Sequence, residues 1–268
     1  MFLFTHTYIL SEAYKIKGFK LEDVPSEVVF GNICPDFLAD SSLRYEKNSK
    51  NYHVEIHDKI RGPGEIEFDV SDLLGLGFAI HVMADNYSQV GTYWRPPNVR
   101  TQGKLKIKEG LVELGDLEEK LGDRKGLFRR RLLQSCFDIN VLRAEYDPVT
   151  QLIRKAHVYL GDNQTEVAEK VVNITGLPNE HIKERLERFL LRYGGDRLYY
   201  QALEQIRTCA AVSVIAGFGL PDYTQEFIQK VESHPAFNVV NRNLGLLNNW
   251  REYALEIAEN ILGSPIDL

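Results

Sequence analysis

Cysteine is scarce in this chain of 268 residues. The only three, Cys34, Cys136 and Cys209, lie far apart and form no Cys-x-x-Cys pair. This pattern excludes a disulfide-stapled scaffold and a closed zinc site made of thiolates, and it is typical of a reducing compartment. We therefore expect a cytoplasmic protein.

Long hydrophobic runs are also missing. The two longest uncharged apolar stretches are Leu73–Ala84 and Cys209–Pro221. Both are shorter than the roughly 20 residues that a membrane-spanning helix needs. The apolar opening MFLFTHTYIL has no basic region and no small-residue cleavage site, and Glu12 and Lys15 follow it soon. We expect neither a transmembrane helix nor a secretory signal.

An excess of positive charge is absent as well. Lys and Arg number 32 and Asp and Glu number 38, so the formal net charge is −6. Because a mildly acidic chain repels polyanions on average, this balance argues against non-specific nucleic-acid binding. Nothing in the sequence identifies an oligomer interface.

Alternation of apolar and polar residues with period two is rare, whereas helical spacing is frequent. Residues 179–193 place Ile182, Leu186, Phe189 and Leu190 on one face of a helix. Residues 250–262 repeat this pattern, and residues 196–218 are predicted to form a long helix that becomes apolar on all sides near Ala210–Ala216. The sequence predicts an all-α, multi-helix bundle.

The chain is expected to form a single domain with three parts. Residues 1–90 carry the candidate metal ligands, and residues 91–103 form a loop with two adjacent prolines. Residues 104–268 form a helical remainder that encloses the ligands. Within it, residues 104–145 are predicted to form two amphipathic helices separated near Gly122–Gly126.

The histidines are concentrated near the start of the chain. Four of the seven, His6, His53, His57 and His81, lie in the first 81 residues. His53 and His57 are four residues apart, and so are His81 and Asp85. Residues four apart lie on one face of a helix, so each pair can reach one cation or two neighbouring cations.

His81 and Asp85 give the strongest physical signal, because they belong to an almost wholly apolar helix. A buried carboxylate costs several kcal/mol unless it is paired or bound to a metal. A hydrogen-bonded core histidine is the alternative for this pair, and also for His6 in FLFTHTYIL. Asp36, which follows a proline, has the alternative role of stabilising the first turn of a helix.

These residues form a candidate set that mixes imidazole and carboxylate ligands without cysteine. Such a mixture suits zinc in a catalytic site, or manganese or iron. The predicted metal ligands are His6, Asp36, His53, His57, His81 and Asp85.

The order of these pieces resembles the zinc-dependent phospholipase C family, which is related to the fungal zinc nucleases that cut single strands. The resemblance rests on THTYIL, GNICPDF, NYHVEIHD and LGFAIHVMADNYSQ and covers residues 1–90. It implies an all-α fold in which Asp36, His81 and one of His53 and His57 hold one cation. His6 and Asp85 would then contribute to a neighbouring cation.

The sequence departs from the family in two places. Gln89 and Gly91 stand where the family has a further histidine, and no later His-x-x-x-Glu pair exists. We therefore expect one or two zinc ions rather than three. A replacement ligand could come from Asp138, Glu145 or His157. These three are more simply explained as ordinary helix residues.

The implied activity is hydrolysis of a phosphoester bond, most naturally a phosphodiester. A bound metal makes hydroxide available at neutral pH, and Asp36 or Asp85 could act as general base. Arg95 and Arg100 in the proline-containing loop are candidate phosphate contacts, with solvated loop charges as the alternative. The expected substrate is a small phosphoester or a phospholipid headgroup.

Two other functions remain open. An HD-domain phosphohydrolase is also all-helical, and His57-Asp58 supplies its dipeptide. A degenerate helical protein that binds metal without catalysis would explain the missing family ligands. Loss of metal on substitution of Asp58 would favour the HD reading.

Overall fold

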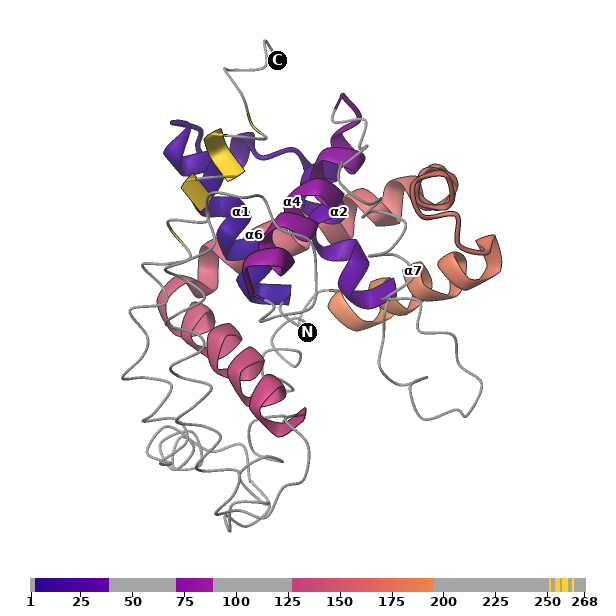
Figure 1. Ribbon diagram of the computed structural model, residues 1–268. Coiled ribbons are helices and arrows are strands. Elements are labelled where there is room, and N and C mark those ends of the chain that lie inside the picture. Colours follow the sequence, from indigo (N-terminus) through magenta and orange to yellow (C-terminus); the bar gives the residue numbers. More distant parts are fainter. Residues whose placement is uncertain are drawn as a thin grey trace.

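A computed structural model describes residues 3–38, 71–88 and 127–194, together with part of 251–262. All of the elements in these residues are helices, and they pack against one another (Figure 1). The prediction of an all-α, multi-helix bundle is confirmed. The predicted loop at 91–103 and the predicted helix at 196–218 lie outside the described residues, so the division into one domain stays a prediction.

Helix α1, Leu3–Ile16, is buried on most of its surface, and its buried residues include the polar Thr5, His6, Thr7 and Ser11. It ends at Gly18, whose φ of 85° lies in the left-handed region that glycine adopts readily. The amides of Gly18 and Phe19 donate to the carbonyls of Lys15 and Tyr14, at 2.9 and 3.1 Å. This Schellman arrangement satisfies two carbonyls at the helix end.

The short 3₁₀ helix η1, Leu21–Asp23, connects α1 to α2, Ser26–Leu38. Lys155, which belongs to the long helix α6, lies against this connection. Its Nζ donates to the carbonyls of Glu22, at 2.7 Å, and Val24, at 2.5 Å. Lys155, from the second half of the chain, thus stabilises the connection between α1 and α2.

Among the described helices, α2 and α4, Leu73–Ser88, form the most extensive contact, and two glycines permit it. An ideal Cβ on Gly77 would collide with the carbonyl of Val28 and would lie 2.8 Å from the Cα of Gly31. A Cβ on Gly31 would collide in turn with the carbonyl of Leu74. The backbones can approach this closely only because neither position carries a side chain.

Helix α4 begins with a side-chain cap. Asp72 Oδ2 accepts a hydrogen bond of 3.0 Å from the amide of Gly75, and Lys170 Nζ lies 4.0 Å from Asp72 Oδ1. Lys170 is also 3.6 Å from Glu27 of α2 and 3.0 Å from Glu166 of α6. This cluster joins three helices at the end of the bundle where α4 begins.

Removal of the cap should weaken the protein by a modest amount. Asp72→Ala is expected to lower the free energy of unfolding by about 1 kcal/mol, because an amide of the first turn loses its acceptor. Urea denaturation of both proteins measures the difference. Asp72→Asn keeps a capping oxygen and should stay within a few tenths of a kcal/mol, so an equal loss in both variants would contradict the capping role.

Helix α6, Leu127–Thr175, begins directly after Gly126, where we expected a helix to start, but it does not end at residue 145. Glu145 and Asn163 have non-helical backbone angles and divide the helix by two kinks. Pro148 lacks an amide proton and cannot bond to the carbonyl four residues earlier, which explains the first kink. The predicted helix end at residue 145 coincides with the first kink, after which the chain resumes a helix.

Helix α7, Asn179–Tyr193, has the predicted bounds, and it buries Ile182, Leu186 and Phe189 as predicted. Phe189 packs on Phe37 of α2, with ring centroids 4.7 Å apart. Near the end of the chain Arg251, Ala254, Leu255 and Ile257–Glu259 are helical, within the predicted range of 250–262.

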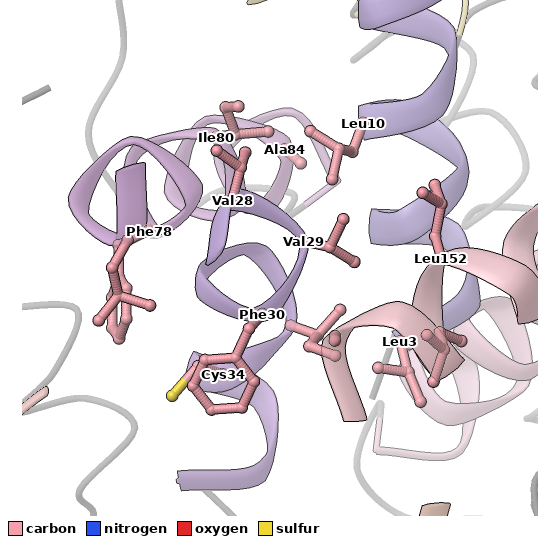
Figure 2. Close-up of a cluster of buried hydrophobic side chains, with 14 of the residues drawn as sticks. Leu3, Leu10, Val28, Val29, Phe30, Cys34, Phe78, Ile80, Ala84 and Leu152 are labelled. Carbon is pink, nitrogen blue, oxygen red and sulfur yellow. The ribbon is translucent and has the colours of Figure 1, made fainter. Parts of the chain in front are cut away.

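Side chains from α1, α2, α4 and α6 form one hydrophobic core. Figure 2 shows Leu10, Val29 and Leu152 together with Phe30, Phe78 and their neighbours in this cluster. The core fixes how α1, α2 and α4 lie relative to one another. Those three helices carry His6, Asp36 and His81.

Candidate metal centre

Three of the predicted ligands meet in the interior, each from a different helix. His6 comes from α1, Asp36 from α2 and His81 from α4. One ligand atom of each residue lies within 4.8 Å of the others. The chain therefore gathers two imidazoles and one carboxylate into a group that could hold a metal ion.

The group is buried in apolar surroundings. His81 is 0% and His6 2% exposed, and the side chain of Asp36 is 9% exposed. An ionised carboxylate in such a place loses its hydration at a cost of several kcal/mol, unless a cation compensates for it. A divalent cation bound between the three residues would provide that compensation.

The spacing of His6 and Asp36 suits coordination better than a direct hydrogen bond. His6 Nε2 lies 4.0 Å from Asp36 Oδ2. Direct N–H···O hydrogen bonds measure about 2.7–3.2 Å. Two ligand atoms on a tetrahedral zinc, each about 2.0–2.2 Å from the ion, are roughly 3.4 Å apart. A small movement of either side chain would therefore allow both to bind one ion.

The orientation of His81 is fixed by a main-chain partner. Its Nδ1 lies 2.7 Å from the carbonyl oxygen of Asn32. Because a carbonyl only accepts, Nδ1 carries the proton and Nε2 presents a lone pair. Metal-binding histidines commonly donate their other ring N–H to a carbonyl or carboxylate in this way. The His81 ring also stacks on His6, with centroids 4.0 Å apart and an angle of 23°.

Of the other predicted site residues, only Asp85 belongs to a described helix. Asp85 is part of helix α4, one turn after His81, but its side chain lies outside the described part of the structure. His53, His57, Arg95 and Arg100 all fall outside the described residues. Their predicted roles as ligands and phosphate contacts stay predictions.

The alternative role considered for Asp36 is wrong. The residue lies in the last turn of α2 rather than in the first turn of a helix. Pro35 is accommodated within α2, so the proline does not mark a helix start here. A carboxylate near the C-terminal end of a helix gains nothing from the helix dipole. Because Asp36 lies beside His6, its carboxylate could instead help to hold a metal ion.

Two other histidines have structural partners instead. His157 Nε2 donates to the carbonyl of Leu190 at 2.9 Å, which joins α6 to α7. His181 Nε2 lies 3.4 Å from the carbonyl of Leu38, and burial lowers the pKa of His181. Glu145 lies 3.8 Å from Lys15. Within the described residues, neither His157 nor Glu145 belongs to the metal group.

One participant was not foreseen. Asn32 contributes its main-chain carbonyl to His81, and any residue type could supply that atom. The sequence contains one indirect signal, because Asn32 stands one helical turn before Asp36 and so lies on the same face of α2.

No family model, curated protein or solved structure matches this chain. In the described residues no helix is long and apolar enough to cross a membrane. The geometry of the three residues and the resemblance in residues 1–90 are the features of the chain that bear on its function.

Proposed function

We propose that the protein is a metal-dependent hydrolase of phosphoester bonds, with phosphodiesters as the favoured class. The observation that carries the proposal is the convergence of His6, Asp36 and His81 in the bundle interior. Three protein ligands that leave a position open are typical of catalytic zinc, whereas structural zinc sites are closed, usually by cysteines. Manganese and iron also accept this ligand mixture.

A cation bound here would polarise a water molecule at neutral pH and attract the phosphoryl oxygens of a substrate. The residues of the chain hold and orient the site. Asn32 fixes the ring of His81 through its carbonyl, and stacking on His81 limits the rotation of His6. The carboxylate of Asp36 supplies negative charge beside His6.

The resemblance divides the ligands between two neighbouring cations. The short distances among His6, Asp36 and His81 also suit a single ion, with Asp85 and one of His53 and His57 as further ligands. The HD-domain alternative leaves His6 and Asp36 without a role, so their convergence favours the phospholipase C-like function.

The proposal predicts that the purified protein contains one or two equivalents of a transition metal. It should hydrolyse bis-p-nitrophenyl phosphate, and a chelator should abolish turnover until zinc or manganese is restored. Elemental analysis and the release of p-nitrophenol measure both. Bound metal without turnover of any phosphoester would favour the non-catalytic alternative, and an absence of metal affinity would refute the proposal. Asp58→Ala should keep the metal, whereas the HD-domain alternative requires its loss.

A further inference from the structure

The side chain of Asn32 is an unusual feature of the core beside this centre. Asn32 is 0% exposed, and neither its Oδ1 nor its Nδ2 has a hydrogen-bond partner in the structure as described. Buried polar side chains almost always have one, because leaving such a group unsatisfied is costly. An apolar residue of the same size would suit a purely structural position better.

The position of Asn32 connects this amide with the metal centre. The residue precedes Asp36 by four positions on α2, so the two share one face of the helix. Its own carbonyl binds Nδ1 of His81. Asp36 and His81 of the centre are therefore both neighbours of Asn32: one shares its helix face, and the other is hydrogen-bonded to its main chain.

The usual structural roles of asparagine do not apply to Asn32. It lies in the middle of α2, Ser26–Leu38, so it caps neither end. It forms no bond to the preceding turn and none between helices in the described part of the chain. Asparagine also has a lower helix propensity than leucine. A bound ligand would give the amide the hydrogen-bond partner that the helices do not provide.

We propose that Asn32 is a substrate-binding residue whose Nδ2 donates to a phosphoryl oxygen held at the centre. This inference rests on the proposed function. A tetrahedral phosphate offers several oxygens, so one can face the cation while another accepts from the amide. A buried amide suits this task because it donates without adding charge, and its hydrogen bond to an anion is stronger than one to a neutral group.

The test measures binding rather than turnover. Asn32→Leu and the smaller Asn32→Ala are compared with the natural protein by titration of the metal alone, then of inorganic phosphate into the metal-loaded proteins. Each variant should bind the metal within a few-fold of the natural Kd. The phosphate Kd should rise by about tenfold or more. Asn32→Leu should also melt at a temperature no lower than the natural protein.

Ser11 provides a matched control. Its hydroxyl is buried and without a hydrogen-bond partner too, but it stands on α1 five residues after His6, on a different face. Ser11→Ala should leave the phosphate Kd unchanged. If the Asn32 variants bind phosphate as tightly as the natural protein, the inference is overturned and the proposed function is unaffected. Loss of metal from either variant has the same two consequences. Failure of the natural protein to bind metal refutes both.

Discussion

His81→Ala should lose the metal and the phosphodiesterase activity together. The binding free energy of structural zinc is about 10–16 kcal/mol and is shared by four ligands. Each ligand therefore contributes roughly 3 kcal/mol, or about a hundredfold in affinity. Nε2 of His81 is the ligand atom that the hydrogen bond to Asn32 leaves available. Titration calorimetry measures the metal Kd, and p-nitrophenol release should fall to the level of a chelator-treated sample.

His157→Ala is the control for this prediction. It removes the same side chain and likewise deprives a main-chain carbonyl, that of Leu190, of its donor. Because His157 joins α6 to α7 and is not a member of the metal group, this variant should be less stable by about 1 kcal/mol and keep its metal. If His81→Ala retained full metal stoichiometry, the assignment of His81 would be wrong.

Gly77→Ala should damage both stability and metal binding. The new methyl group would meet backbone atoms of α2, at 2.8 Å from the amide nitrogen of Asn32 and the Cα of Gly31, and backbone cannot rotate away. The helices must separate, which should cost about 3 kcal/mol in the free energy of unfolding. Since Asp36 and His81 lie on the two separated helices, metal affinity should fall as well. Urea denaturation and metal titration test the two effects.

Gly161→Ala is the matched control, because it makes the same change inside a helix with free space. The nearest atom to its Cβ would be Leu190 Cδ2, at an ordinary 4.0 Å. It should stabilise the protein by about 0.5–1 kcal/mol and leave metal affinity unchanged. Equal stability of the two alanine variants would show that the α2–α4 contact is less tight than the structure indicates.

Much of the bundle could be predicted where a single helix carries its own signal. The bounds of α7 follow from its amphipathic pattern, and α4 follows from its apolar run. The break at Glu145 coincides with a predicted helix end, but the helical segment that resumes directly after it had no separate boundary in the prediction, because Pro148 fits the first turn of a helix as well as a kink. The contact of Gly31 with Gly77 could not be foreseen, since it depends on which faces of two helices meet.

The candidate site divides in the same way. His6, Asp36 and His81 could be selected from the sequence because polar, metal-binding groups stood in apolar segments. The hydrogen bond from His81 to Asn32 could not, because a main-chain carbonyl has no signature in the sequence. Chemistry carried by side chains is visible in sequence, whereas support from the backbone appears only once the helices are packed.

The contact of Lys155 with the carbonyls of Glu22 and Val24 has a consequence for the order in which the chain folds. Synthesis proceeds from the N-terminus, so His6, Asp36 and His81 leave the ribosome well before Lys155 does. Because α6 packs against both α1 and α2, the nascent chain contains all three candidate ligands long before α6 can hold them in their final positions. Metal capture should therefore wait for the docking of α6 rather than follow directly on the appearance of His81.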